Sequence, residues 1–525
     1  MGCSISGVFV KGSAIVAIYG IVEFFPDSVT TLRAGGSYEA NDHTFVPYGV
    51  PHFDDGSDAG LARSTALAAP WNRADTESVE LFGQLERRFG RDWVLKVNGA
   101  RLHQTNDSKY AYVLGTINPV THLVGGPSAI ESDTVGRNLT VDATLTGAFD
   151  LFGRRHEITL GADHSHISSD IPLNFLDGYV PPFDPFTSDL NDLQEPTTSS
   201  FGAVAKLRRN QYGVMGALRL HPADGLSLIG GGRFNWLDET LNSQTFFFGE
   251  LLFEDMIQTK TKGKFVPYGG IVYELSPNYS IYVSYADIYN PQMSMLRQDM
   301  TRLPSALDGV NIEAGIKGSW RNGTLNGSLA LFRIRQTGGS VQDPSIVSPL
   351  PDCCYLEETN RSEGVELELS GKLAAGWWLT AGYTYNKNET VSELASDGLI
   401  LSSQTPKHLF KLWTSYDLPG ALKSWTIGGG IVAKSASYVE GAGCPRFDAL
   451  GNCAPGENPA TPFNVTQKAY AVVDLRVAYE IDAHWSAALS ANNIFDKRYY
   501  QNIGENSAGY SNAWYGIPRN ILLND

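Results

Sequence analysis

Hydrophobic and polar side chains alternate along many segments of this chain. In residues 138–151, positions such as Leu139 and Val141 are apolar, whereas the intervening positions, such as Thr140 and Asp142, are polar. The same split recurs in two further segments, 365–370 and 473–482. Because the side chains of a strand alternate between its two faces, each segment predicts a strand that separates an apolar medium from a polar one.

Two architectures fit this alternation: a soluble sandwich with one face on its core, and a β-barrel in a membrane. The number and length of the segments favour the barrel. Many runs reach about ten residues or more, the length at which a tilted strand crosses a bilayer. No apolar run reaches the roughly eighteen residues of a spanning helix. The pattern therefore predicts an all-β fold, a transmembrane antiparallel β-barrel.

Connections of two kinds separate the predicted strands. Short ones rich in Gly, Pro, Asn and Asp suit hairpin turns, and they occur at 26–27, 90–92, 153–154, 223–225, 277–278, 322–323, 374–376, 419–420 and 482–483. Long polar stretches lie between them, at 41–74, 106–134, 170–205, 241–259, 290–308, 338–360, 387–404, 436–466 and 497–510. Turns on one side and loops on the other are typical of outer-membrane barrels. Nine hairpins and a last strand at 511–523 predict nineteen strands, an odd number where single-chain bacterial barrels have an even one.

Composition and motifs exclude other functions. The net charge of −16 argues against a nucleic-acid partner, whose phosphates require a basic surface. The sequence contains no nucleophile elbow, HExxH pair, phosphate-binding loop or paired CxxC motif, so we expect no enzyme activity and no catalytic residues. Gly230–Gly232 and Gly428–Gly430 lie inside alternating segments and predict closely packed or bent strand positions.

Cysteines and one histidine pair are further candidates for chemistry in this chain. Cys444 and Cys453 flank a Pro/Gly-rich loop, and in an exported protein a disulfide between them is favoured over free thiols or metal ligands. The state of the adjacent Cys353 and Cys354 is left open. His164 and His166 lack a third ligand nearby, which favours an interfacial pair over a metal site.

Several long segments resemble one family of proteins, the TonB-dependent ferric-siderophore receptors of the ferripyoverdine and ferric-coprogen type. The resemblance rests on QYGVMGALRLHPADGLSLIGGGRFNW (211–236), VPYGGIVYELSPNYSIYVSYADIYNPQ (266–292), GVNIEAGIKGSWRNGTLNGSLALFRIRQ (309–336), SEGVELELSGKLAAGWWLTAGYTYN (362–386), NNIFDKRYY (492–500) and WYGIPRNILL (514–523). These segments are ordered and spread over most of the chain.

The resemblance implies a barrel of twenty-two strands with an N-terminal plug and a short box that engages TonB. Residues 1–525 are then expected to be the barrel alone, with about nineteen of the strands and incomplete at both ends. No segment resembles a signal peptide, a TonB box or the plug, and the last strand stops at Leu523, Asn524 and Asp525 where the family continues to a terminal aromatic residue. Interaction with TonB is expected only if a plug and a TonB box lie upstream.

Ligand-binding candidates follow from the chemistry of a ferric siderophore. The chelator already wraps the iron, so the protein offers aromatic faces and hydrogen-bond donors rather than metal ligands. The candidates are Trp71, Trp236, Tyr289, Tyr355 and Trp514, with Arg297 and Arg302 as cationic partners of an anionic complex. For each aromatic residue the alternative is the interfacial girdle that any barrel carries.

The sequence thus predicts an outer-membrane receptor that imports ferric siderophores. Its expected partners are the ferric siderophore and the lipid of the outer membrane, with no cofactor and no resident metal, and the resemblance implies a monomer. The alternative is a plugless passive pore, or the non-functional remnant of such a receptor. A plug encoded immediately upstream would distinguish them.

Overall fold

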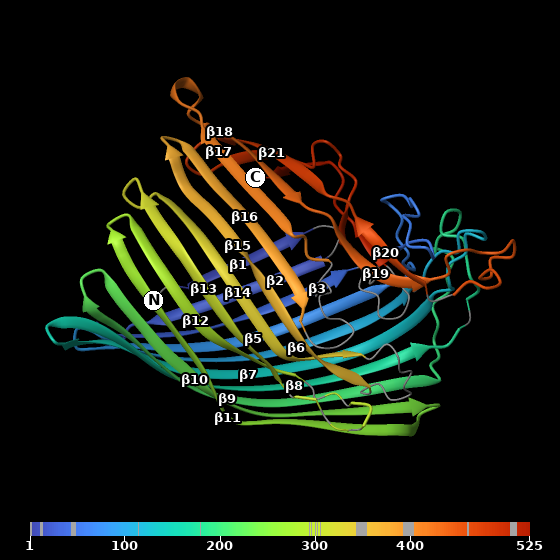
Figure 1. Cartoon of the computed structure of the whole chain (residues 1–525), viewed down its shortest axis with the longest axis horizontal. Coiled ribbons are helices and arrows are strands. Elements are labelled where there is room, and N and C mark those ends of the chain that lie inside the picture. The colour runs from blue at the N-terminus through green and yellow to red at the C-terminus, as the bar shows by residue number, and fades with distance from the viewer. Residues whose placement is uncertain are drawn as a thin grey trace.

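A computed structural model describes the chain except for residues 1–2, 11–13, 44–48, 114, 179, 293–294, 296, 300, 302, 305, 343–353, 392–403, 459–460, 504–511 and 525. Within the described residues, one antiparallel sheet contains twenty strands. Each strand pairs with the next one of the sheet along the chain. Figure 1 shows that the sheet curves into a wall with its strands tilted.

The strands of this sheet are β1 (Cys3–Val10), β2 (Ala14–Phe24), β3 (Thr30–His43), β5 (Arg73–Phe89), β6 (Trp93–Tyr112), β7 (Ser128–Leu151), β8 (Arg154–Leu176), β9 (Phe201–Ala223), β10 (Leu226–Phe247), β11 (Glu250–Ser276), β12 (Tyr279–Pro291), β13 (Ala306–Trp320), β14 (Leu325–Gln342), β15 (Tyr355–Ala374), β16 (Trp377–Thr390), β17 (His408–Asp417), β18 (Trp425–Lys434), β21 (Tyr470–Glu480), β22 (Ser486–Asn492) and β25 (Asn520–Asn524). The smaller elements are β4 (Val50–Pro51), β19 (Ser437–Gly443), β20 (Thr461–Gln467), β23 (Tyr500–Ile503), β24 (Asn512–Tyr515) and the short 3-10 helix η1 (Gly420–Leu422). None of the described helices is long and apolar enough to cross a membrane.

The alternating pattern separates two faces of this sheet. Leu81, Leu139 and Val214 lie on the outer face and are 61%, 42% and 51% exposed. The inner face carries polar pairs that lie directly opposite one another. Arg33 donates to Gln84 (2.7 Å), Gln84 donates to Asn98 (2.8 Å), and Asn98 donates to Asp142 (2.8 Å). A wall that is apolar outside and polar inside is the expected surface of an outer-membrane barrel.

The nine predicted hairpin turns are confirmed, because each falls between two paired strands of the sheet. Two of them show why these residue types are needed. Gly153 has φ of 72° and Asn322 and Gly323 have φ of 55° and 85°, in the left-handed region that Gly and Asn adopt at low cost.

Three expectations about the strands are wrong. Within the described residues the main sheet holds twenty strands rather than nineteen, because residues 3–10 form β1 and pair with β2. The predicted last strand 511–523 is divided, because β24 pairs with β23 and β4 in a separate small sheet and only β25 joins the main sheet. The predicted loop 241–259 is instead the tip of a long hairpin, in which β10 and β11 continue to a turn at Phe248 and Gly249. Near this turn apolar residues occupy consecutive positions, at 246–248 and 251–253, so the alternation that marks a barrel strand disappears.

The two edges of the sheet are β1 and β25, and they do not pair with each other in the described part of the chain. The structure therefore shows a barrel wall that is open along one side, rather than a closed barrel. The described parts of the long connections lie at the end of the wall opposite the nine predicted turns, on the right of Figure 1.

Candidate ligand-binding site

Five long connections meet at the loop end of the wall and share a hydrophobic core. They are the segments after β3, β6, β8, β18 and β22, and in Figure 1 several of them gather beside β19 and β20. Their buried residues form one cluster: Val50, Leu61, Leu67, Val113, Ile117, Val124, Leu190, Val439, Val465, Tyr500, Ile503 and Ala513. We call this set the loop core. Burial of this apolar surface gives loops that are far apart in sequence one arrangement.

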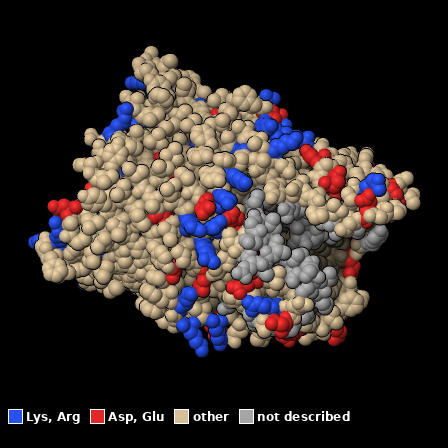
Figure 2. All heavy atoms as spheres, in the orientation of Figure 1, with Lys and Arg blue, Asp and Glu red and all other residues tan. Residues whose placement is uncertain are grey.

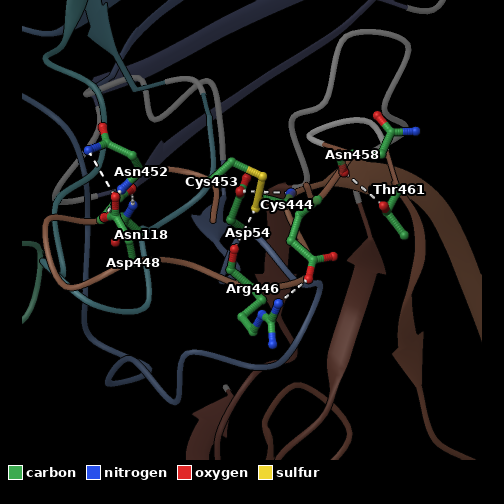
Figure 3. The surroundings of a disulfide bond; sticks show 11 residues. Asp54, Asn118, Cys444, Arg446, Asp448, Asn452, Cys453, Asn458 and Thr461 are labelled. Atoms are coloured by element: carbon green, nitrogen blue, oxygen red, sulfur yellow. Dashed lines mark hydrogen bonds and ion pairs between the residues drawn. A yellow bond between two sulfur atoms is a disulfide. The ribbon is translucent and has the colours of Figure 1, made fainter. Parts of the chain in front are cut away.

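Polar contacts join the loops around a disulfide between Cys444 and Cys453, the pair that the sequence favours. Asp54 lies beside it (Figure 3) and accepts hydrogen bonds from the Thr116 hydroxyl (2.6 Å) and the Cys444 amide (3.2 Å). The Asn118 side chain donates to the carbonyl oxygen of Gly451 (2.7 Å). Three connections are thereby held together by a few polar residues.

A cavity of about 280 Å³ opens next to the loop core. Its wall combines tyrosine rings with charged and polar groups, namely His52, Asp58, Gln467, Lys468, Lys497, Arg498, Tyr499, Tyr500 and Tyr515. Lys468, Lys497 and Arg498 are exposed, whereas Tyr500 is buried. We call this the tyrosine cavity.

Hydrogen bonds and ring contacts position the cavity wall. The Tyr500 hydroxyl donates to Asp58 (2.6 Å), and the Tyr500 ring stacks on that of Tyr515 with their centroids 4.8 Å apart. The Arg498 guanidinium lies over the Tyr515 ring, 4.7 Å from its centroid, and donates to the Leu61 carbonyl oxygen (2.7 Å). Arg498 thereby fixes Tyr515 while its charge stays at the cavity wall.

The surroundings shift the pKa values of Tyr500 and Asp58 in opposite directions. Burial, with the hydrogen bond to Asp58, raises the pKa of the Tyr500 phenol. Burial also acts to raise the pKa of Asp58, but the hydrogen bonds from Tyr500 and the Gly60 amide outweigh it and hold that pKa below its ordinary value. The proton therefore stays on Tyr500, and Asp58 is an anion at neutral pH.

Two of the predicted ligand residues lie in this group of loops. The Trp71 indole N–H donates to the carbonyl oxygen of Leu193 (3.0 Å), a residue that packs against the loop core. Trp514 lies in β24, which pairs with β23 and β4. The indole of Trp71 is thus engaged in joining two loops.

Three others lie on another part of the wall, where β12 to β15 reach the loop end. Arg297 forms an ion pair with Glu357 (3.0 Å), two residues after Tyr355 on β15. The Tyr289 hydroxyl shares a hydrogen bond with Thr261, and the Lys264 ammonium lies 5.9 Å from the centre of its ring. The structure thus brings Arg297 and Tyr355 to one strand end and places Tyr289 on β12.

Some of the remaining predicted residues lie in the described part of the chain, and others do not. Trp236 lies on the outer face, directly opposite Tyr212, in a position that fits the girdle alternative. Arg302 and Cys353 are outside the described residues, and Cys354 is buried. His164 and His166 also face outward, since they pair with Val141 and Leu139 of β7.

The sequence did not single out Asp58, Arg498, Tyr500 or Tyr515. For Arg498 and Tyr500 a signal was present in the segment NNIFDKRYY (492–500), where two tyrosines directly follow two cations. Asp58 and Tyr500 are 442 positions apart, so no local pattern could pair them.

Comparison with known proteins gives consistent matches. The family model described as TonB dependent receptor-like, beta-barrel, matches residues 21–494. The ferric-pyoverdine M114 receptor PbuA of Pseudomonas sp. (strain M114) is 34% identical over 96% of this chain and 59% of its own length. The ferric-pyoverdine BN7/BN8 receptor of Pseudomonas putida is 31% identical over 96% of this chain and 58% of its length.

Among solved structures, the ferripyoverdine receptor of the outer membrane of Pseudomonas aeruginosa, bound to ferripyoverdine, superimposes with a TM-score of 0.83. It is 29% identical, and the match covers 97% of this chain and 64% of that one. The chain thus spans about three fifths of the length of the curated relatives it matches. This chain belongs to the TonB-dependent receptor-like β-barrel family, whose Pseudomonas siderophore receptors are outer-membrane proteins.

Proposed function

We propose that this protein takes part in the uptake of a ferric siderophore across the outer membrane. The relatives named above are ferric-pyoverdine receptors, which supports this ligand class. The observation that carries the proposal for this chain is the tyrosine cavity at the loop end. Its three exposed cations, Lys468, Lys497 and Arg498, lie around the stacked Tyr500 and Tyr515 and offer positive charge to a bulky anionic complex at the mouth of the cavity.

We propose further that residues 1–525 supply the barrel wall and the binding loops. In this view the plug and the segment that contacts TonB lie outside these residues, and the receptor acts as a monomer. The match of the barrel model to residues 21–494 and the partial coverage of the relatives support this division. Of the seven predicted ligand residues, we retain Tyr289, Arg297 and Tyr355 as a second contact region, and Trp71 and Trp514 as supports of the loops.

The test is the binding of purified ferric pyoverdine to the protein in detergent, measured by isothermal titration calorimetry. We expect saturable binding, and we expect substitution of Lys468 and Lys497 by Gln to weaken it about tenfold, since two charges that face the ligand are lost. A matched control replaces Lys372 and Lys423, which lie near the turn end, with Gln. Binding that is absent from the unmodified protein, or that the control pair weakens equally, would contradict the proposed site.

A conductance measurement distinguishes a passive pore from a siderophore receptor. The protein is reconstituted in planar bilayers without siderophore. A large, permanently open channel combined with no siderophore binding would support the passive pore and overturn the receptor assignment.

A further inference from the structure

The upper part of β11 is an edge of the wall. On one side β11 pairs with β10 from Glu250 to Tyr273, whereas on the other side β12 pairs with it only from Tyr268 to Ser276. Between Glu250 and Pro267 no other described strand pairs with β11, and no backbone–backbone hydrogen bond to the rest of the described chain reaches it from that side. Such an edge presents unpaired N–H and C=O groups to which a further strand can bind.

This edge lies beyond the part of the wall that contacts lipid. Trp236, on the outer face opposite Tyr212, marks the aromatic girdle. Gln258 pairs with Thr240 and Glu250 pairs with Phe247, which places the edge about 10–25 Å above Trp236 at about 3.3 Å per residue and a tilt near 45°. In Figure 2 a broad tan zone without charge separates the charged residues at the turn end from those nearer the loops, as expected for the belt that contacts lipid. The edge is on the loop side of that belt.

Large apolar side chains are exposed along this edge and at its turn. Phe248, Leu252 and Met256 are 73%, 68% and 59% exposed, and Leu251 and Phe253 are exposed as well. Neighbouring apolar residues that remain exposed on a protein surface in water mark an interaction site. Lipid does not account for them, because they lie above the girdle.

The segment Glu250–Gln258 lacks two devices that commonly block a free edge. It contains no Pro and no Lys. Its conformation is also fixed, since β10 pairs with it along its length and the Phe248 amide at the turn donates to the carbonyl oxygen of Ser200 (2.7 Å). The edge is therefore preorganised for a partner strand.

All the charges of this segment are negative. The carboxylate of Glu254 accepts hydrogen bonds from Asn242 (2.8 Å) and Gln244 (3.1 Å) and also interacts with Lys206. Glu250 and Asp255, by contrast, have no ion pair within 4.0 Å among the described residues. These two carboxylates are therefore left for the basic side chains of a partner.

The two faces of the segment differ in character. Leu252 and Met256 lie on the outer face, where Met256 is opposite Asn242. Glu250 and Asp255 lie on the inner face, because their partners on β10 have the other parity. A strand added to this edge continues both faces, so apolar residues suit its outer face and basic residues its inner face.

A second copy in the same membrane does not fit this edge. Two copies would be related by a two-fold axis along the membrane normal. Strands tilted by about 35–45° would then cross at about 70–90°, whereas paired strands run nearly parallel or antiparallel. The geometry therefore favours a segment that approaches from outside the cell.

We propose that the free edge of β11 binds an extended polypeptide segment from outside the cell by strand addition. The segment alternates apolar residues, which pack on Leu252 and Met256, with Lys or Arg residues, which pair with Glu250 and Asp255. Backbone hydrogen bonds to Glu250–Gln258 supply the affinity, and the side-chain pattern supplies the specificity.

The test uses a synthetic peptide of alternating Val and Lys with a terminal fluorophore, and the purified full chain in dodecyl maltoside. Fluorescence anisotropy measures binding, and hydrogen exchange locates it. We expect saturable binding that protects the amides of residues 250–258. The same peptide with N-methylated Val residues keeps its charge but loses the donors of one edge, so it should bind at least about tenfold more weakly. A peptide of alternating Val and Glu should bind as weakly.

Two variants of the protein test the two faces separately. L252S/M256S removes the apolar contacts and E250Q/D255Q removes the negative charges, and each should weaken binding of the Val–Lys peptide at least about tenfold. The matched control is L422S/L450S, which replaces two exposed leucines that lie outside β11. It should bind the peptide like the unmodified protein.

Several results would overturn the proposal. They are equal binding of the N-methylated or the Val–Glu peptide, and unchanged binding by both double variants of β11. Binding of the Val–Lys peptide without protection of residues 250–258 would place it elsewhere on the protein and would also overturn it.

Discussion

The Tyr500 hydroxyl donates a hydrogen bond of 2.6 Å to Asp58, although 442 positions separate the two residues in the chain. This contact joins the segment after β22 to the segment after β3, at a place where both also enter the loop core. Tyr500 further stacks on Tyr515 and lies 5.2 Å from the ring of His52. One buried phenol therefore links three polar or aromatic groups of the tyrosine cavity.

Replacement of Tyr500 by Phe should loosen the loops without unfolding the wall. The variant keeps the ring but removes the hydrogen bond from a buried phenol to a charged carboxylate, a loss of about 1–3 kcal/mol. Hydrogen exchange should increase in residues 49–72 and 493–503 and stay unchanged in the strands. Tyr479→Phe at the turn end is the control. Equal exchange in Tyr500→Phe and the unmodified protein would show that this bond does not hold the loops.

The loops should also loosen in acid. The folded-state pKa of Asp58 is held below the unfolded value near 3.9, so the ionised carboxylate stabilises the folded loops above that pH. This contribution is lost as the pH falls through the folded-state pKa. Asp496, whose pKa Arg63 lowers through a two-fold hydrogen bond, acts in the same direction. Protease susceptibility of the loops should be constant from pH 7 to 5 and rise below about pH 4. The D58N/D496N variant should show a smaller rise, and an equal one would assign the acid effect to other groups.

Removal of the disulfide should act locally. The bond closes a segment with a sequence separation of 9, and chain entropy for such a short loop amounts to about 2–3 kcal/mol. We expect C444S/C453S to increase hydrogen exchange in residues 443–458 and to leave the melting of the wall unchanged. Reduction of the unmodified protein with dithiothreitol should reproduce the effect. If both treatments leave exchange unaltered, the contacts of Asp54 and Asn118 are sufficient to hold this loop.

Trp236 should stabilise the protein in the membrane without contributing to siderophore binding. It lies on the outer face opposite Tyr212, on the side of the wall that faces away from the lumen. Trp236→Ala should therefore lower thermal stability in lipid bilayers, by about 1–3 kcal/mol for a lost interfacial aromatic side chain, and leave ferric pyoverdine binding unchanged. Tyr515→Ala should instead weaken ferric pyoverdine binding and leave the thermal stability in lipid bilayers unchanged. Loss of pyoverdine binding in Trp236→Ala would show that this residue belongs to the ligand site.

The two ends of the Gly230–Gly232 segment should respond differently to the same substitution. A Cβ at Gly232 would lie 2.4 Å from the Phe265 ring, whereas a Cβ at Gly230 meets nothing within 4 Å. We expect Gly232→Ala to destabilise the wall by about 1–3 kcal/mol through overpacking and Gly230→Ala to be neutral within about 0.5 kcal/mol. Urea unfolding of the refolded protein in detergent measures both. Similar midpoints for the two variants would show that Phe265 moves aside freely.

The strands and turns of this protein are encoded locally. Alternation at positions such as Leu139 and Asp142 requires only neighbours along one strand, and the turn at Asn322–Gly323 requires only residues that tolerate positive φ. These features predicted an all-β fold of antiparallel strands and all nine hairpins, whereas the family was inferred from the resemblance of several long segments. Local reasoning failed at 241–259, since consecutive apolar residues near the hairpin tip hide the alternation, and at residues 3–10, which the strand count omitted. It also failed at 511–523, which forms two strands in different sheets.

The candidate sites depend on contacts that no local pattern contains. Tyr500 meets Asp58, and Cys444 meets Asp54, only because five loops bury apolar residues in a common core, and burial of this kind is non-directional and independent of sequence separation. Likewise, the upper part of β11 is a free edge only because β12 pairs with it no further than Tyr268. The alternation of apolar and polar residues along the chain determines which residues face the lipid. Strand register and loop packing determine which residues from distant parts of the chain come into contact.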